Sequence, residues 1–114
     1  MELKPGVELF GLNILMRPVL KIVEDIYHES GRPNGSFITC TTGGIHLPHS
    51  FHAFGLAIDY RNRFFPEPVK DAVYVKMRGR LERKGYQVIR HDTHFHVEPN
   101  DRLLARHSLL INWK

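Results

Sequence analysis

Apolar residues recur every three or four positions in two stretches of the chain, which is the spacing of one face of an α-helix. The first stretch runs from Leu15 to about Ser30 and is followed by Gly31, a residue type that commonly ends helices. The second covers about 67–84 and follows Pro66, and proline is favoured where a helix begins. The pattern therefore predicts two amphipathic helices. Ahead of the first helix, three apolar residues are expected to anchor the chain to the core: Leu9, Phe10 and Leu12.

Shorter segments rich in β-branched and aromatic residues predict strands. They cover 36–41, 55–60, 86–90 and 94–98. A short polar turn joins the last two, which predicts a β-hairpin. The tail over 102–113 fits either a helix or a strand. Two helices and at least four strands in 114 residues predict a single small α+β domain that spans 1–114.

Composition narrows the classes of protein that fit. The chain is 42% hydrophobic and 25% charged, as in an ordinary soluble domain. It has no apolar run long enough to span a membrane, and its first residues, MELKPG, lack the layout of a signal peptide. We therefore expect synthesis without a leader. Cys40 is the single cysteine, which excludes an intrachain disulfide and a metal site built from a cluster of cysteines.

Charge is distributed unevenly along the chain, whose formal net charge is +4. Residues 1–60 carry four basic and six acidic side chains, whereas residues 61–114 carry twelve and six. Basic residues concentrate between Lys76 and Arg90, and this run fits a solvated helix face or a surface attracted to an anionic polymer. No aromatic residue interrupts the run before Tyr86. A platform for stacking bases therefore has little support, and we expect no nucleic-acid partner.

Six of the eight histidines fall into two windows, 46–59 and 91–98. Imidazole and carboxylate groups are ligands that suit divalent metals, zinc above all. Because alternate residues of a strand share a face, four such groups of the second window are expected on one side: Asp92, His94, His96 and Glu98. Burying them together is costly without a cation among them. Taken alone, the window fits a metal site and an exposed polar strand face equally well.

The two windows contain elements with a specific spacing: Ser50-x-His52-x-x-Gly55-x-Ala57-x-Asp59 and, about 35 residues later, His94-Phe95-His96. This combination resembles the metal-binding motifs of zinc-dependent DD-peptidases of the M15 type. That family includes D-Ala-D-Ala carboxypeptidases and dipeptidases, and the L-alanyl-D-glutamate endopeptidases of phage endolysins. The resemblance implies an α+β domain with an antiparallel sheet and two main helices, as in lysostaphin-type enzymes and the hedgehog signalling domain.

The resemblance also implies roles for individual residues. His52, Asp59 and His96 are implied as zinc ligands, and three protein ligands leave one position open for water, as catalytic zinc requires. His94 is implied as the general base or as the group that stabilises the transition state. Strand geometry alone permits either histidine of the pair as the third ligand, so this order depends on the resemblance.

Small and polar residues of the two elements have supporting roles in this interpretation. Ser50 is expected to orient a ligand or to cap a turn. Gly55 and Ala57 are expected to let the backbone pass close beneath the metal. Glu98 is expected to support a ligand from the same strand face rather than to react.

The sequence leaves open the roles of the remaining acidic and histidine residues in the two windows. Asp92 does not have the spacing of the acid that related endolysin enzymes place before their ligand histidine. It becomes the candidate base only if His94 is the ligand. His46 either faces the cleft or, like His49, is a loop residue without a role.

The implied substrate is the peptide stem of peptidoglycan, in which water activated by zinc would hydrolyse an amide bond. Many family members bind a substrate carboxylate with an arginine on the strand before the zinc motif, and segment 36–41 has none. Arg61 and Arg63 are the nearest cations. The missing arginine weakens the case for a carboxypeptidase and favours an endopeptidase. We expect a monomer that reaches the cell wall as a phage enzyme after release, or that works in the bacterial cytoplasm.

Two alternatives remain open at the level of sequence. A catalytically silent zinc module of the same fold would use the site for binding, as in the hedgehog domain. A histidine-metal nuclease is a weaker alternative, suggested by the isoelectric point of about 9.5. The three classes differ in their products. The peptidase would release muropeptide fragments, the silent module would release nothing, and the nuclease would produce nicked DNA.

Overall fold

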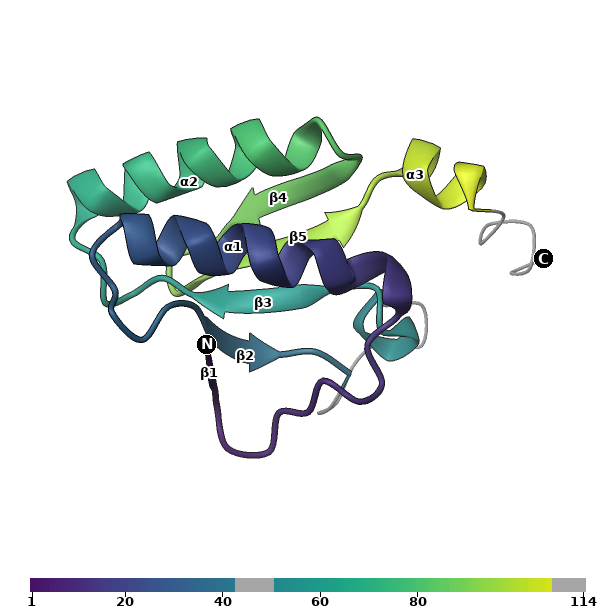
Figure 1. Cartoon of the computed structure of the whole chain (residues 1–114), viewed down its shortest axis with the longest axis horizontal. Helices are drawn as coiled ribbons and strands as arrows, with labels where there is room; N and C mark the ends of the chain where they lie inside the picture. Colours follow the sequence, from purple (N-terminus) through teal and green to yellow (C-terminus); the bar gives the residue numbers. More distant parts are fainter. Residues whose placement is uncertain (43–50, 108–114) are drawn as a thin grey trace.

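Five strands form one mixed sheet in the computed structural model, which describes residues 1–42 and 51–107. The strands are β1 (Glu2–Leu3), β2 (Phe37–Cys40), β3 (Ile58–Arg61), β4 (Tyr86–Arg90) and β5 (His94–Pro99). Their order across the sheet is β1-β2-β3-β5-β4 (Figure 1). β4 and β5 form the expected hairpin, and β5 lies between β3 and β4.

The direction of the strands departs from the expectation at one edge. Along β2, β3, β5 and β4, each strand runs antiparallel to its neighbour, as expected. β1 pairs with β2 in parallel, so the sheet is mixed and not purely antiparallel. A strand of two residues is too short to leave a periodic pattern in the sequence, which is why it was not predicted.

The helices follow the predicted apolar stripes. α1 (Arg17–Glu29) continues from a short 3₁₀ turn, η1 (Ile14–Met16), whose first turn is capped by Asn13. α2 (Glu67–Glu82) begins after Pro66, as expected. Both predicted helices are confirmed to within about two residues at each end.

Two short helices complete the described part of the chain. η2 (Phe51–Phe54) precedes β3, and α3 (Asp101–Arg106) follows β5. Asn100 caps α3, because its side chain accepts a hydrogen bond from the backbone N–H of Leu103 at 2.8 Å. The tail that fitted either a helix or a strand thus begins as a helix. Within the described ranges, every helix is too short or too polar to cross a membrane.

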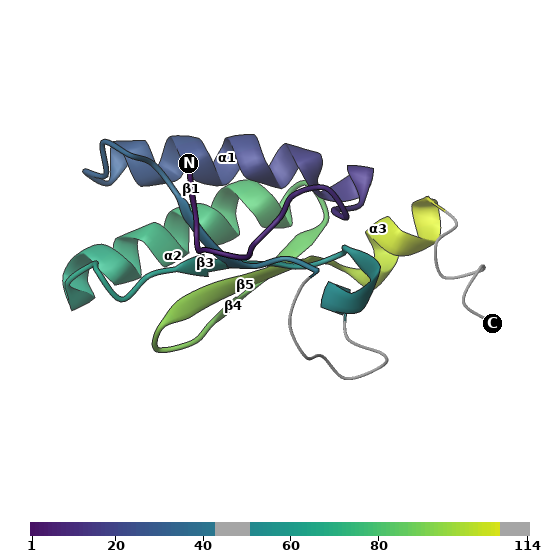
Figure 2. The same cartoon turned by 90° about the horizontal axis from the view of Figure 1, so that it is seen from below.

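α1 and α2 lie side by side against one face of the sheet (Figures 1 and 2). The core between helices and sheet is built mainly from fully buried apolar side chains: Met16, Val19, Val23, Ile26, Ile38, Ile58, Tyr60, Val73, Met77, Leu81, Phe95 and Val97. On β5, buried Phe95 and Val97 alternate with His94, His96 and Glu98. The residues with candidate chemistry therefore point to the face opposite the two helices.

Two segments differ from the sequence prediction. The second predicted strand begins only at Ile58, because Gly55 closes a turn with a φ of 71°. Phe10 is 96% exposed, so it does not anchor the chain to the core. Its neighbours Leu9 and Leu12 are partly buried against the core and perform that role.

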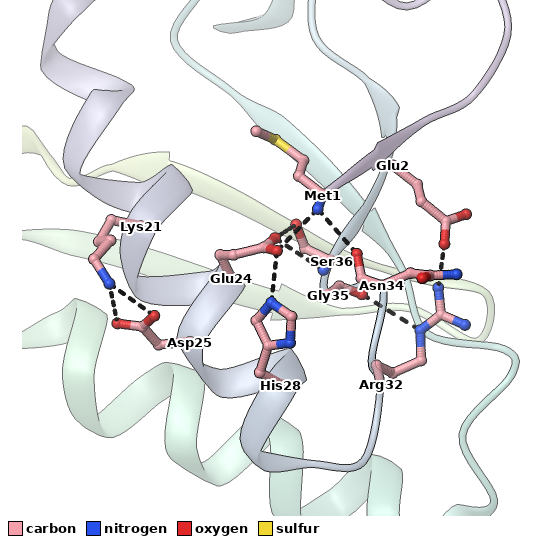
Figure 3. A network of polar contacts seen from close by, with 10 residues as sticks. All are labelled: Met1, Glu2, Lys21, Glu24, Asp25, His28, Arg32, Asn34, Gly35 and Ser36. Carbon is pink, nitrogen blue, oxygen red and sulfur yellow. Dashed lines mark hydrogen bonds and ion pairs between the residues drawn. The ribbon is translucent and has the colours of Figure 1, made fainter.

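A polar cluster ties the start of the chain to α1 and β2 (Figure 3). At its centre, Glu24 accepts hydrogen bonds from the backbone N–H and the hydroxyl of Ser36 at 3.0 and 2.7 Å, and from the amine of Met1 at 2.9 Å. Burial raises the pKa of Glu24, but these hydrogen bonds lower it more, to about 2. Gly35 leaves room for the carboxylate, since a Cβ at this position would overlap it. The cluster therefore fixes α1 against the strand that leads to the candidate site.

Candidate metal centre

The pairing of three neighbouring strands lays out the candidate site. Asp59 on β3 lies opposite His96 on β5 and opposite Cys40 on β2. Two residues further along β3, Arg61 lies opposite His94. Directly opposed residues in antiparallel strands have Cβ atoms about 4.5–5.5 Å apart, so their side chains are neighbours. The register therefore gathers side chains from three separate parts of the sequence on one surface.

His52 reaches the same surface from η2. The residue is buried, and its Nδ1 lies 2.6 Å from the backbone carbonyl oxygen of Thr41. Because a carbonyl only accepts, Nδ1 carries a proton and donates it. The other ring nitrogen, Nε2, lies 3.2 Å from Oδ2 of Asp59. The hydrogen bond to Thr41 thus holds the ring with Nε2 toward Asp59, which is how proteins commonly orient a histidine that binds a metal.

Asp59 is the shared partner of three imidazole rings. Its Oδ1 lies 2.8 Å from Nδ1 of His96, and its Oδ2 lies 3.2 Å from Nε2 of His52 and 3.9 Å from Nε2 of His94. Burial raises the pKa of Asp59, but hydrogen bonds and charge attraction from His52 and His96 lower it more, to well below its usual value. Asp59 is therefore a fixed negative charge at the centre of the cluster.

His96 lies between two carboxylates. Its Nδ1 faces Asp59, and its Nε2 lies 2.7 Å from Oε1 of Glu98. Burial lowers the pKa of His96, but the two acidic partners raise it more, to about 9. Burial raises the pKa of Glu98, while hydrogen bonds with His96 and Gln87 lower it below its usual value. Glu98 thus contacts His96 directly, and its supporting role stays a prediction.

Cys40 joins this cluster, which the sequence did not lead us to expect. Ligand atoms of Cys40, His52 and Asp59 lie within 4.8 Å of one another, and this group could hold a metal ion. Sγ of Cys40 lies 3.7 Å from Nδ1 of His52. Burial and the negative charge of Asp59 raise the pKa of the thiol. A single cysteine excludes a cluster of cysteines, but it does not exclude a mixed set of ligands.

A register shift in β2 explains why Cys40 was missed. Regular alternation would place Cys40 on the same face as Ile38, which is buried in the core. Instead, Ile38 pairs with Tyr60 and Cys40 pairs with Asp59, so the pairing shifts between the two β2 residues as in a β-bulge. The shift turns Cys40 to the site. Its place at the end of a predicted strand, just before the first histidine window, is the only signal for it in the sequence.

His94 lies at the edge of the cluster and is partly exposed. Its ring stacks on His91 with centroids 4.5 Å apart, and its Nδ1 lies 3.2 Å from Oγ1 of Thr93. Burial lowers the pKa of His94, and this outweighs the attraction of Asp59. The ring is therefore neutral near neutral pH and has a lone pair that can accept a proton.

Asp92 does not lie on the strand face predicted for it. β5 begins only at His94, and Asp92 lies in the exposed turn that joins β4 to β5. The prediction failed because it extended the alternation of the strand into the turn of the hairpin. Three other predicted residues lie outside the described residues, and their roles stay predictions: His46, His49 and Ser50.

The backbone of Gly55 lies very close to the segment before α1. The expected neighbour was a bound metal. A Cβ at this position would overlap the carbonyl oxygen of Gly11 and lie 2.9 Å from the backbone nitrogen of Asn13. The backbone N–H of Asn13 also donates a hydrogen bond to the carbonyl of Gly55 at 2.9 Å. The absence of a side chain therefore lets the segment before α1 pack on the turn after η2. The expected role of Gly55 beneath a metal stays a prediction.

Acidic neighbours pair with most of the basic run along α2 and β4. Of its six basic side chains, four form ion pairs within the described residues: Lys76 and Arg80 with Glu29, Arg78 with Glu82, and Arg90 with Glu67 and Asp71. Charges that are already paired at a surface attract a distant polyanion less than free ones do. These pairs favour the interpretation of the run as a solvated helix face.

Fold and site together define a class of molecule. It is a small α+β domain with two helices on one face of its sheet and, on the other, a group of His, Asp and Cys side chains that could hold a metal ion. Comparisons with protein-family models, with curated proteins and with solved structures found no match to this chain. The likeness to M15-type peptidases therefore rests on the motif residues alone.

Proposed function

We propose that the chain is a zinc-dependent peptidase that hydrolyses an amide bond in the peptide stems of peptidoglycan. One observation carries the proposal. His52, Asp59 and His96, which the motif implies as ligands, contact one another although they come from η2, β3 and β5. An enzyme of this kind would reach the wall after release from the cell that makes it, or would process wall fragments in the cytoplasm.

The chemistry of the donor atoms supports zinc as the cofactor. Imidazole nitrogen, carboxylate oxygen and thiolate sulfur are the ligands that zinc takes in proteins. The hydrogen bond from Nδ1 to Thr41 leaves Nε2 of His52 to face Oδ2 of Asp59 at 3.2 Å. A carboxylate oxygen and a ring nitrogen at this distance share either a proton or a metal cation between them.

In the proposed reaction, the protein residues orient groups and move a proton. When bound, zinc supplies a Lewis acid that polarises a carbonyl and lowers the pKa of water. His94, whose Nε2 lies 3.9 Å from Oδ2 of Asp59, is the residue proposed to accept and return the proton. Burial keeps the pKa of His94 below its usual value, so the ring is neutral and can accept. Glu98 would orient His96 through its Nε2.

A second candidate function is a zinc module that binds a partner without hydrolysing it. Cys40 favours this candidate, because Cys40, His52 and Asp59 together with His96 would supply four protein ligands. Zinc with four protein ligands is typical of structural sites, whereas catalytic zinc keeps one position open. The two candidates therefore differ in whether Cys40 binds the metal.

Digestion of purified muropeptides by the zinc-supplemented protein tests the peptidase. We expect new masses in which one amide bond has gained a water, and no products after chelation. The masses of the products also identify the bond. Intact muropeptides in the presence of protein that holds its zinc would contradict the peptidase and favour the silent module.

Metal analysis of three variants tests the set of ligands. With His52, Asp59 and His96 as ligands, Cys40→Ser is expected to keep about one zinc per chain, while Asp59→Asn loses it. Asp92→Asn makes the same chemical change in an exposed turn and is expected to keep the metal. Loss of zinc from Cys40→Ser would assign a ligand role to the thiolate and favour the silent module.

A further inference from the structure

A polar pocket lies where the end of α2 meets α3. Its volume is about 230 Å³. Three arginines line it: Arg83, Arg102 and Arg106. The other lining residues are Glu82, Gly85 and Asn100. The pocket shares no residue with the candidate metal centre, so the two can be examined separately.

Packing and backbone hydrogen bonds hold α3 against the turn that follows α2 (Figure 1). Leu103 and Leu104 of α3 are buried in the core. Gly85 has a φ of 99°, and a Cβ at this position would lie only 3.0 Å from Cβ of Leu103. The carbonyl of Gly85 also accepts a hydrogen bond from the backbone N–H of Asn100 at 2.7 Å. The walls of the pocket are therefore fixed relative to each other.

The three arginines reach the pocket from two helices. Arg102 and Arg106 are four residues apart, so they lie on the same side of α3, one turn from each other. Arg83 approaches from the end of α2. Its Nε donates a hydrogen bond to the carbonyl of Gly79 at 3.0 Å, which leaves its two terminal nitrogens for a ligand. Three guanidinium groups therefore converge on one pocket.

These arginines differ from most of the basic run along α2 and β4, whose members pair with acidic side chains. Within residues 1–42 and 51–107, no ion pair involves Arg83, Arg102 or Arg106. Glu82 is the acidic residue among those that line the pocket, and it pairs with Arg78 at 3.0 Å. Three positive charges therefore face a carboxylate that already has a partner, and such a pocket attracts anions.

We propose that this pocket binds the phosphate group of a small phosphorylated molecule. A phosphate monoester carries a charge of about −1.5 to −2 at pH 7 and has three strong acceptor oxygens. Guanidinium groups present parallel N–H donors that match these oxygens. A carboxylate has two oxygens and a single charge, so it fits three guanidinium groups less well. Because one water molecule occupies about 30 Å³ of liquid, the pocket holds a phosphate and part of the molecule that carries it.

NMR titrations at constant ionic strength test the proposal with four probes: inorganic phosphate, glycerol 3-phosphate, acetate and glycerol. We expect backbone signals of 83–85 and 100–106 to shift with both phosphates, with and without chelator. Acetate should bind at least tenfold more weakly, and glycerol should cause no shift. The two phosphates distinguish the sources of the group. Tighter binding of glycerol 3-phosphate identifies an ester as the ligand, whereas equal affinity identifies free phosphate.

Substitutions of single residues locate the binding. Arg102→Gln and Arg106→Gln are each expected to weaken the binding of glycerol 3-phosphate about tenfold or more. Arg102→Lys keeps the charge without the parallel donors, so it should keep part of the affinity. Glu82→Gln removes the carboxylate and should strengthen binding severalfold, which damage to the fold would not do. Arg17→Gln is the matched control, because Arg17 is exposed at the start of α1, outside the pocket.

Circular dichroism shows whether each variant is folded. Arg102 and Arg106 are both exposed, so we expect the fold to tolerate either change. If one of the two variants does not fold, the other decides the test.

Several results would overturn the proposal. Absence of shifts at millimolar phosphate is one, and equal affinity for phosphate and acetate is another. An equal loss of affinity in Arg17→Gln would mean that phosphate is attracted by the net charge and not by the pocket. A short oligonucleotide that binds more tightly than glycerol 3-phosphate, with the same dependence on Arg102, would assign the pocket to nucleic acid. Failure of the proposed peptidase leaves the inference intact, because phosphate binding requires neither metal nor cleavage of muropeptides.

Discussion

The two carboxylate oxygens of Asp59 lie close to the rings of three histidines. Oδ1 faces His96, while Oδ2 faces His52 and lies further from His94. A buried polar group that loses its partner costs roughly 1–3 kcal/mol, so removal of this side chain destabilises the fold as well as the site. Asp59→Asn keeps the shape and removes the charge. Asp59→Asn therefore distinguishes an effect on metal binding from an effect on packing better than Asp59→Ala does.

The two histidines of β5 are expected to respond differently to replacement by alanine. His96 contacts Asp59 at 2.8 Å, whereas His94 lies 3.9 Å away and is more exposed. His94→Ala should keep zinc and lose turnover of muropeptides by about 10²–10⁴-fold, while His96→Ala should lose both. Elemental analysis and product masses measure the two properties.

A third histidine supplies the control for this pair. His107→Ala, in an exposed residue after α3, should change neither the zinc content nor the turnover. A metal-free His94→Ala protein beside a His96→Ala protein that holds zinc would exchange the roles of the two residues.

Sequence spacing predicted the residues that meet where the backbone is regular. His94, His96 and Glu98 share a face because β5 alternates without interruption. The prediction was wrong for Asp92, which lies in the hairpin turn, and it missed Cys40, which depends on a register shift. Neither irregularity leaves a mark in the order of apolar and polar residues.

Elements with a long apolar stripe were predictable, and short ones at the edge were not. α1 and α2 repeat their buried positions over several turns, so a pattern exists to be recognised. β1 and η2 have two and four residues, respectively, which is less than one full repeat of a recognisable pattern. Their structure depends on contacts with distant parts of the chain, such as the pairing of β1 with β2.

Replacing Gly55 with alanine should destabilise the protein by about 2 kcal/mol or more. The residue has a positive φ of 71°, which L-residues adopt at a cost, and a Cβ would collide with the backbone of Gly11. Gly79→Ala is the control, because this helical glycine has open space around it and alanine there should stabilise α2 by about 0.5–1 kcal/mol. Urea denaturation measures both changes. Equal effects would contradict the close packing of the turn after η2.

Glu24 is expected to make the stability of the junction between α1 and β2 depend on acidic pH. Its pKa is lowered from 4.5 to about 2 in the folded protein, so folding favours the charged form. This contribution is complete above about pH 4.5 and is lost as the pH falls toward 2. The difference in unfolding free energy between the wild-type protein and Glu24→Gln should therefore shrink over that range.

Denaturation curves recorded between about pH 6 and pH 2 measure this difference. Ser36→Ala removes the serine hydroxyl, one of several groups that donate to Glu24, and should narrow the difference without abolishing it. A difference that stays constant over the whole range would contradict the role given to Glu24.

For the whole molecule, the candidate centre joins β2, η2, β3 and β5 at one point. A metal that binds only the folded state stabilises it by mass action, by about 2.7 kcal/mol at a concentration one hundred times its Kd. Chelation should therefore lower the Tm by about 10 °C. Thermal unfolding followed by circular dichroism measures the shift, and Asp59→Asn should not respond to the chelator. An unchanged Tm after confirmed removal of the metal would mean that the metal does not connect these segments.

The α+β class followed from the number and type of the elements, because two helices and several strands in so short a chain have few ways to form one core. The order of the strands in the sheet could not be predicted from the number and type of the elements. β5 is inserted between β3 and β4, and this arrangement is what carries His96 to Asp59. Pairing between distant strands depends on tertiary packing, which the local pattern does not record.

The register shift between Ile38 and Cys40 makes the pairing of β2 as important as its composition. If the same residues paired without the shift, Cys40 would lie opposite Ile58 and would turn toward the core. Substitutions that favour regular pairing, and not only replacement of the cysteine, would then decide during evolution whether sulfur reaches the site. Among descendants of this sequence, the pairing of β2 would sort chains that can present a thiol to the metal centre from chains that cannot.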